Sequence, residues 1–391
     1  MIPTRRAGRR GAPPGAPGAA PPRGGSPAAI EVRALTERTA WNALVLSLGA
    51  ADLRQSWEWG EILGRQGWRP LRLAAFAGGT CRAAMAVLVR ALPGLGRVAF
   101  VPRGPLLGTA DDGVPALAAL VAAAGAATGA AFLRVSPALA DGVPALATLA
   151  AAGLRPLDDF WSLWNPPRNV MRLDLAGSER EVLGRMAPKR RQHVATAAKK
   201  GLAATVTTDR AALRTFYAML REHAARQRYP IRSWSYFEAL WEAFGAPGAA
   251  ALVLGHVGGT PAAALLGVRF GPVAYSLYAP STPAARATAL GDLVHWEWIR
   301  WARAQGCREI DFGSSGTHVP PRPTDRALGI YRFKAELGCH LVLYAPYHDA
   351  VFAPGRYRLL RALERAALGR ARGWLARLPA PLRGALARRL A

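Results

Sequence analysis

Ile310-Asp311-Phe312-Gly313-Ser314-Ser315, followed about twenty residues later by Tyr331-Arg332-Phe333-Lys334-Ala335-Glu336-Leu337-Gly338, is the stretch that decides the fold. The first segment is typical of a short apolar strand that ends in an acid and a glycine-containing turn. We expect the second segment to lie where the chain leaves a Pro/Gly loop and enters a strand. Strand ends that open onto loops are where α/β proteins place binding sites. Phe333 beside Lys334 sets a flat apolar face next to a cation, which predicts an acyl-transfer or nucleotide-handling pocket.

Upstream of this stretch, the pattern predicts one unit of helices and strands that starts after Pro166-Pro167. Ser178 and Glu181 have the spacing of a helix capping box. Leu293, Val294, Trp298 and Trp301 recur at helical spacing, so we expect them to be buried. Glycine-rich turns separate antiparallel strands. The expected helices are 178 onward, 211–225, 235–244 and 290–305, and the expected strands are 170–175, 250–256, 262–270, 273–279, 307–312 and 341–344.

Residues 30–165 show a similar order of elements. A helical stretch leads to Gln55-Ser56-Trp57-Glu58-Trp59-Gly60, and strands are expected at 71–77, 83–90 and 97–101 before an Ala-rich helix and a strand at 131–135. Strands joined by hairpins and followed by helix–strand units favour a mixed α/β (α+β) fold over a doubly wound sheet. The body is therefore predicted as two copies of one mixed-sheet unit, 30–165 and 166–340.

The two ends of the chain differ from this body. Residues 1–29 are rich in Pro, Gly and Arg, and we expect them to be disordered. Residues 356–391 form a basic Arg/Leu/Ala segment that is predicted to be helical and is broken at Pro379 and Pro381. This tail could lie on an anionic membrane, or it could pack its leucines on the body. The sequence leaves both readings open.

The chain of 391 residues carries a net charge of +26, from 51 Lys and Arg against 25 Asp and Glu. A body this basic attracts polyanions such as tRNA or acidic cell-wall precursors, although an Arg- and Ala-rich genome would raise the charge as well. Cys81, Cys307 and Cys339 have no metal-site spacing, which predicts a reduced, cytoplasmic protein without a structural metal. The uncharged run 114–133 fits a helix, a glycine break and a strand better than a membrane span, and no secretory signal is evident, so we expect a soluble protein.

Two clusters are candidates for holding anions. Lys189, Arg190, Arg191, Lys199 and Lys200 form the densest internal basic segment, which could bind tRNA or another phosphate-bearing ligand or could be a solvated helix face. Arg232 and Tyr236 lie four residues apart at a helix start, and Tyr275 and Tyr278 lie on or near a strand. Together they could hold a phosphorylated or carboxylated substrate, although buried tyrosines and a surface arginine explain the pattern as well.

Lys334 is the candidate catalytic group. When an acyl group passes from an ester to an amine, negative charge develops on oxygen, and a fixed ammonium stabilises that charge. Phe333 beside it could provide a stacking face or exclude water, and Asp311 is a candidate for orientation only. The sequence has no GxSxG, GxxxxGK[ST], HExxH or strand-linked GxGxxG motif, which leaves serine-hydrolase, P-loop, metalloprotease and dinucleotide-binding chemistry unsupported.

Taken in order, the motifs between residues 35 and 355 resemble those of the Fem-type aminoacyltransferases, which form peptidoglycan interpeptide bridges. The matching segments are Gln55-Ser56-Trp57-Glu58-Trp59-Gly60, Val101-Pro102-Arg103-Gly104-Pro105, Arg190-Arg191 with Lys199-Lys200-Gly201, Arg232 with Tyr236-Phe237, Tyr275-Ser276-Leu277-Tyr278-Ala279-Pro280-Ser281, Asp311-Phe312-Gly313, and Tyr331-Arg332-Phe333-Lys334 with Leu337-Gly338.

This resemblance implies two tandem GNAT-like (acetyltransferase-type) domains, with 341–355 returning to complete the first. It implies transfer of an amino acid from aminoacyl-tRNA to an amine of a peptidoglycan precursor, lipid-linked or nucleotide-linked, without metal or bound cofactor. Phe333 and Lys334 would meet the tRNA acceptor end, and Arg232, Tyr236 and Tyr278 would hold the precursor's diphosphate and sugar-peptide part. Such an enzyme would be cytoplasmic, with possible peripheral contact to the inner face of the plasma membrane through the tail.

Two departures from the family pattern leave rival hypotheses open. Leu63 lies where family members often carry a lysine that contacts the precursor, and the long helical arm of some members is missing because Gly201 leads directly into a strand. One rival is an acyl-CoA-dependent N-acyltransferase acting on a polysaccharide or small amine, although residues 281–290 lack a clear glycine-rich pyrophosphate cradle. The other is a non-catalytic tRNA- or membrane-binding protein.

Overall fold

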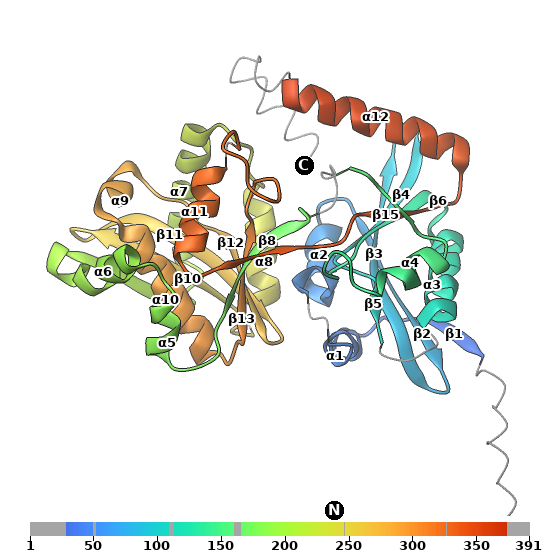
Figure 1. The fold of residues 1–391 in the computed structure, drawn as a ribbon, viewed down its shortest axis with the longest axis horizontal. Coiled ribbons are helices and arrows are strands. Elements are labelled where there is room, and N and C mark those ends of the chain that lie inside the picture. The colour runs from blue at the N-terminus through green and yellow to red at the C-terminus, as the bar shows by residue number, and fades with distance from the viewer. Residues whose placement is uncertain are drawn as a thin grey trace, which may run out of the picture.

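The computed structural model of the chain describes residues 29–49, 52–108, 113–159, 166–245, 247–325 and 327–373. Nearly all of the segment predicted to be disordered, and residues 374–391 of the predicted tail, lie outside these ranges. The described residues form two halves, each built on one mixed sheet with its own helices (Figure 1).

The first half contains an eight-stranded sheet in the order β1-β2-β3-β4-β6-β15-β7, with β5 paired to β3. Among its strands as far as the structure describes them, only β4 and β6 pair in parallel. Its elements, apart from β15, are β1 (Ile30–Ala34), α1 (Arg38–Ser47), the 3-10 helix η1 (Leu53–Gln55), α2 (Trp57–Gly64), β2 (Arg69–Ala77), β3 (Thr80–Leu92), β4 (Gly96–Pro102), β5 (Leu106–Leu107), α3 (Gly113–Thr128), β6 (Ala130–Ser136), α4 (Leu146–Ala151) and β7 (Arg155–Pro156).

The second half contains a seven-stranded sheet in the order β14-β8-β13-β12-β11-β10-β9. Its single parallel pair among the described strands is β12 with β13. Its elements are β8 (Asn169–Asp174), α5 (Glu179–Gly184), α6 (Pro188–Thr196), the 3-10 helix η2 (Ala198–Lys200), β9 (Leu202–Thr207), α7 (Ala212–Gln227), α8 (Trp234–Phe244), β10 (Ala250–Val257), β11 (Thr260–Phe270), β12 (Val273–Tyr278), α9 (Pro283–Thr288), α10 (Leu290–Ala304), β13 (Glu309–Ser314), α11 (Leu328–Glu336) and β14 (His340–Leu343).

The chain returns to the first half after β14. β15 (His348–Val351) pairs with β6 and β7, and α12 (Pro354–Gly373) then lies along the first sheet (Figure 1). The return was predicted at residue 341, but β14 pairs with β8 and so belongs to the second sheet. The crossing therefore occurs between β14 and β15.

Local sequence signals explain much of this pattern. The predicted capping box is present: the Ser178 hydroxyl accepts from Glu181 N, and the Glu181 carboxylate accepts from Ser178 N. One prediction was wrong, because residues 331–338 do not enter a strand. Phe333 and Lys334 lie on α11, and Gly338, with φ of +92°, follows the helix end and turns the chain into β14.

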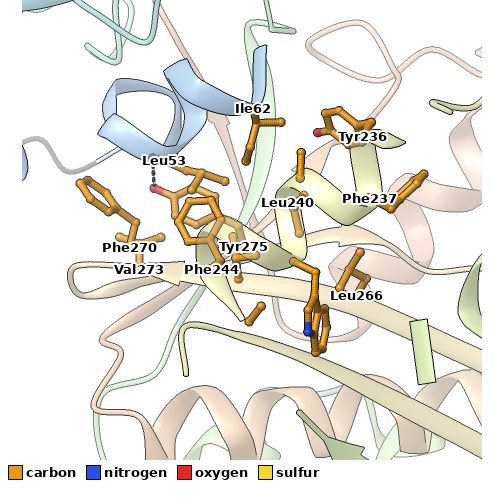
Figure 2. Packing of buried hydrophobic residues seen from close by; sticks show 14 of the residues in the cluster. Leu53, Ile62, Tyr236, Phe237, Leu240, Phe244, Leu266, Phe270, Val273 and Tyr275 are labelled. Carbon is orange, nitrogen blue, oxygen red and sulfur yellow. Dashed lines mark hydrogen bonds between the residues drawn. The ribbon is translucent and has the colours of Figure 1, made fainter. Parts of the chain in front are cut away.

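A shared apolar core joins the two halves. Trp41, Leu53 and Ile62 of the first half belong to one buried cluster with Phe237 and Tyr275 of the second (Figure 2). Leu53 N also donates a hydrogen bond of 3.1 Å to the Tyr275 hydroxyl. Because apolar burial is the dominant favourable term in folding, this core fixes how the halves sit against each other.

Candidate functional site

The parallel strands β12 and β13 separate before either strand ends. They pair only from Val273–Tyr275 to Glu309–Asp311, although β12 continues to Tyr278 and β13 to Ser314. On its other side β13 also shifts register against β8 between Asp311 and Ser314. The parallel pair of the first sheet, by contrast, stays together to Pro102 and Ser136. Separation of the parallel strands before their carboxyl ends is thus a feature of the second half.

The side chain of Lys334 reaches this irregular segment from α11. Its ammonium donates to Phe312 O at 2.6 Å and to Ser314 O at 2.7 Å. An ammonium has three N–H donors, and the third has no acceptor among the described residues. Burial lowers the pKa of Lys334 to about 8, against the opposing influence of Cys339 and Asp311. The group is therefore a fixed cation near neutral pH with one donor available to a ligand.

Phe333 contacts an imidazole and a guanidinium. Its ring meets His295 edge to face at 5.0 Å, and the Arg190 guanidinium lies 4.8 Å from its centroid. Burial lowers the pKa of His295 to about 4, so this imidazole is neutral near pH 7. Phe333 thus helps to set the apolar surroundings of α11, and its contact with a tRNA end stays a prediction.

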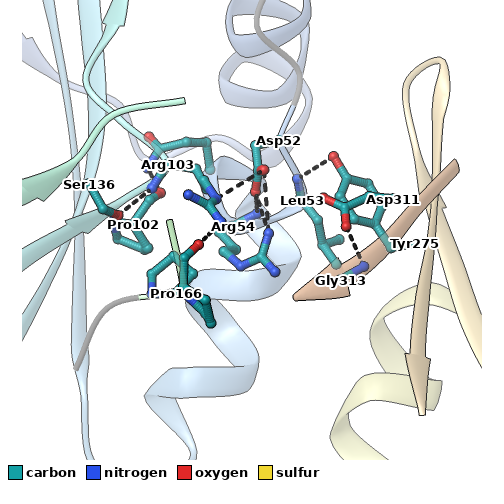
Figure 3. Close-up of polar contacts among 12 residues, drawn as sticks. Asp52, Leu53, Arg54, Pro102, Arg103, Ser136, Pro166, Tyr275, Asp311 and Gly313 are labelled. Carbon is teal, nitrogen blue, oxygen red and sulfur yellow. Dashed lines mark hydrogen bonds and ion pairs between the residues drawn. The ribbon is translucent and has the colours of Figure 1, made fainter. Parts of the chain in front are cut away.

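Asp311 is buried at the seam between the halves (Figure 3). One carboxylate oxygen accepts from Gly313 N at 2.6 Å, and the other lies 3.8 Å from the Arg172 guanidinium without a hydrogen bond among the described residues. The side chain therefore fixes the backbone at the end of β13 and adds a negative charge that acts on Lys334.

Further charged groups at the seam were not among the predicted site residues. Arg54 donates to Asp52 at 3.1 Å, and Arg103, which is fully buried, donates to Pro167 O at 2.6 Å (Figure 3). The Arg103 guanidinium also lies 4.2 Å from the centroid of Tyr344. The signal that could have revealed Arg103 is its Pro-Arg-Gly-Pro setting, where a left-handed φ of +59° holds the arginine in a tight turn.

A groove of about 980 Å³ lies between the two halves. Gln66 and Arg90 line it from the first half, and α7 with residues 229–233 lines it from the second. Three arginines (Arg90, Arg221, Arg232), one glutamate (Glu222) and the tyrosines Tyr217 and Tyr229 are among its lining residues. A groove with this charge and these ring faces suits an anion that carries a flat or apolar part.

The predicted substrate-binding residues divide between this groove and the core. Arg232 lines the groove, and its guanidinium lies 5.5 Å from the centroid of Tyr236. Tyr236 and Tyr278 are hydrogen-bonded to each other, and burial raises the pKa of both hydroxyls. Tyr275 is separate, because it is buried in the shared core and its hydroxyl accepts from Leu53 N. Only Arg232 among these four lines the groove directly.

The predicted basic segment also divides into two groups. Arg190 pairs with Asp292 and Glu336, both at 2.8 Å, and Arg191 donates to the carbonyls of Gly184 and Met186. These two arginines hold α6 to its neighbours. The exposed cations of the predicted set are Lys189, Lys199 and Lys200.

The described residues contain no group of three or more His, Cys, Asp or Glu side chains that could hold a metal ion. Nor does this part of the chain contain a helix long and apolar enough to cross a membrane.

Comparisons with known proteins identify the fold. Residues 188–335 match the family model "Acetyltransferase (GNAT) domain". The structure is similar to that of FemX, at 20% identity over 84% of this chain and 99% of that one, with a TM-score of 0.76. It is also similar to a tandem GNAT protein from the clavulanic acid biosynthesis pathway (14% identity, 83% and 98% coverage, TM-score 0.50). A Bacteroides thetaiotaomicron protein of unknown function is likewise similar (13% identity, 83% and 100% coverage, TM-score 0.52). No curated protein sequence matched this chain.

These likenesses confirm the predicted fold class. The protein is a mixed α/β protein of two tandem GNAT-like domains, and its resemblance to the Fem type holds at the level of the fold. The second half is the domain that the acetyltransferase model matches. It is also the half in which β12 and β13 separate and Lys334 is fixed.

Proposed function

We propose that this protein is an aminoacyltransferase that moves an amino acid from aminoacyl-tRNA to an amine on the stem peptide of a peptidoglycan precursor. The observation that carries the proposal is the Lys334 ammonium, held by two carbonyls of β13 inside the acetyltransferase-type domain. Both substrates are cytoplasmic molecules, so the proposal places the protein in the cytoplasm. Interpeptide bridge formation would be its role in building the cell wall.

The reaction proposed for this site is aminolysis of an ester. The acceptor nitrogen attacks the ester carbonyl carbon, a C–N bond forms, and the bond from that carbon to the ribose oxygen of the tRNA breaks. The proton lost by the amine ends on the departing ribose oxygen. The third N–H of Lys334 would donate to the carbonyl oxygen as its negative charge develops, and one such donor is worth about 3 kcal/mol of barrier. The ester is already activated, so the step needs no metal or bound cofactor.

The acceptor's acidic part fits the groove between the halves. Guanidinium groups bind phosphates through paired hydrogen bonds, and Arg90, Arg221 and Arg232 line the groove from both halves. The Arg232 guanidinium lies over the ring of Tyr236, whose hydroxyl is hydrogen-bonded to that of Tyr278. We infer that this groove holds the diphosphate and sugar-peptide part of the precursor.

The donor's polyanionic part would meet the exposed lysines near α6. Lys189, Lys199 and Lys200 are exposed on the same half as Lys334. Contacts between such cations and phosphates release counterions, so transfer from tRNA should weaken steeply as salt rises.

One assay tests the donor and the acceptor together. The purified protein is incubated with radiolabelled aminoacyl-tRNA or with radiolabelled acetyl-CoA, and with a nucleotide-linked or lipid-linked muropeptide. Label that moves from tRNA to the muropeptide, and does so much less with Lys334→Ala, supports the proposal. Label that moves only from acetyl-CoA would reject it.

An acyl-CoA-dependent N-acyltransferase remains the second candidate. The match of residues 188–335 to the acetyltransferase model favours it. The acetyl-CoA arm of the assay decides between the two donors, and a polysaccharide or small amine offered as acceptor extends the test to this second reaction.

A further inference from the structure

Helix α12 buries an ion-paired arginine and glutamate on its inner side and exposes two leucines on its outer side. On its inner side Leu360, Arg361 and Glu364 are all buried against the first half. On its outer side Leu359 is 50% exposed and Leu363 is 46% exposed. A surface helix ordinarily shows the reverse arrangement, with an apolar stripe facing the core. The outer side of α12 therefore needs an explanation of its own.

The inner side is locked in place by buried ion pairs. Arg134 on β6 donates to Asp349 at 2.8 Å and pairs with Glu364 at 2.7 Å. Arg361 pairs with Glu364 and with Asp159. Leu360 packs with the apolar cluster over β4 and β6. Because removing one partner of a buried pair is costly, the helix cannot readily roll to bury its outer leucines instead.

The outer side forms an apolar ridge between arginines. At 100° per residue, the exposed Leu359, Ala362, Leu363 and Ala366 fall on one stripe. Arg358 and Arg365 flank this stripe on one side, and Arg356 flanks it on the other. Glu364, the single acid of α12, is turned inward to Arg134. The charge that α12 exposes is therefore entirely positive among its described side chains.

We propose that this apolar ridge docks on an anionic lipid surface. Helices that lie in the membrane interface combine an apolar stripe with flanking Lys and Arg, and they bind through buried apolar area and attraction to acidic headgroups. The ridge meets both conditions, and its orientation is preset by the inner ion pairs. The inference concerns a surface on the first half and does not depend on the reaction proposed for the second.

A second copy of this chain is a poorer fit to the same ridge. A two-fold interface would bring the ridge of one molecule onto that of its partner, and with it the same flanking arginines. Like charges facing each other oppose such an association. An anionic membrane meets these arginines with the opposite charge.

Vesicle flotation with the full-length protein tests the proposal. Wild type is mixed with vesicles of phosphatidylcholine alone or of phosphatidylcholine and phosphatidylglycerol in a 3:1 ratio. We expect binding to the anionic vesicles only, and its loss in the double variant Leu359→Gln/Leu363→Gln. Arg356→Gln/Arg358→Gln should weaken binding about 30-fold, since each basic residue near such a surface contributes roughly fivefold.

Matched controls distinguish binding through this ridge from nonspecific binding through other exposed apolar side chains. Leu46→Gln/Val206→Gln removes two similarly exposed apolar side chains elsewhere, on α1 and β9, and should bind as wild type does. Helix content and thermal unfolding of each variant show that it is folded. Transfer to a nucleotide-linked muropeptide in the absence of vesicles should be unchanged in the ridge variants, so failure of this inference is distinct from failure of the proposed reaction.

Three outcomes would overturn the inference: no binding of wild type to anionic vesicles, equal binding to neutral vesicles, or unaltered binding of the Leu359→Gln/Leu363→Gln protein. A wild-type dimer in solution that the ridge variants lose would assign the ridge to a second copy of the chain instead.

Discussion

At the scale of single residues, the surroundings of Lys334 define what its ammonium can do. Two carbonyls of β13, two residues apart, accept from it, and burial has moved its pKa to about 8. The ammonium is therefore held rigidly, and its pKa lies close to neutral pH. A donor of this kind stabilises an oxyanion only while it is protonated, which links the proposed chemistry to pH.

Lys334 should therefore limit the rate on the alkaline side. The acceptor amine must lose a proton, so the rate rises with pH at first. Lys334 loses its proton as pH passes about 8, so kcat should fall above that pH. Lys334→Arg keeps a cation that does not titrate in this range and should lack the alkaline fall, whereas Lys334→Ala should lower kcat about 100- to 1000-fold. Single-turnover rates from pH 6 to 10 measure both, and an alkaline limb shared by wild type and Lys334→Arg would contradict this role.

The arginines of the groove should act on acceptor binding. Arg221→Ala or Arg232→Ala removes a charge-assisted hydrogen bond worth about 1.5–3 kcal/mol, which corresponds to a KM for the muropeptide raised about 10- to 150-fold. The KM for aminoacyl-tRNA should stay constant. Arg300→Ala, an exposed arginine of α10 paired with Glu297, is the matched control. A change in kcat alone, with KM unaltered, would argue against the groove as the acceptor site.

At the scale of elements, the sequence predicted most of the helices and strands whose apolar residues recur at regular spacing. The hairpins of β2–β3 and β10–β11 and the helices α7, α8 and α10 follow their apolar patterns, and the capping box before α5 was visible in Ser178 and Glu181. The helix around Phe333 was missed because the preceding Pro/Gly loop suggested a strand. The ion pairing of Arg190 was hidden as well, because its partners Asp292 and Glu336 are more than a hundred residues away. Long-range pairing of this kind leaves no local signal.

The attachment of β15 and α12 to the first sheet should depend on Arg134. Arg134→Met leaves the carboxylates of Asp349 and Glu364 buried without their shared partner, at a cost of about 3–5 kcal/mol. Urea unfolding followed by far-UV circular dichroism measures this loss. Adding Asp349→Asn and Glu364→Gln removes the stranded charges and should restore part of the stability. A loss below 1 kcal/mol in Arg134→Met would mean that water reaches these groups.

At the scale of the whole molecule, the two halves share one architecture but contribute different parts of the candidate site. The second half has the parted strands and Lys334, whereas the parallel strands of the first half stay paired to their ends. The first half instead contributes Arg90 to the groove and the buried Arg103 to the seam. The two halves can contribute to one site because the shared core around Leu53 and Tyr275 holds them together. This core fixes the position of the groove relative to Lys334.

The charge of the whole chain should appear in the salt dependence of the reaction. A net charge of +26 draws any polyanion, but only cations that contact phosphates release counterions. We expect log KM for aminoacyl-tRNA to rise linearly with log salt concentration. Lys199→Gln/Lys200→Gln should raise KM and lower that slope by about 0.7–0.9 for each phosphate contact removed.

The slope distinguishes local contact from bulk attraction. Arg180→Gln/Arg358→Gln, which removes the same charge from exposed positions on α5 and α12, should leave the slope unchanged. If both double variants lowered the slope of log KM against log salt concentration equally, the attraction of tRNA would depend only on the total charge of the protein. A slope near zero in wild type would remove tRNA as the donor, and the acyl-CoA reaction would then be the better account of this site.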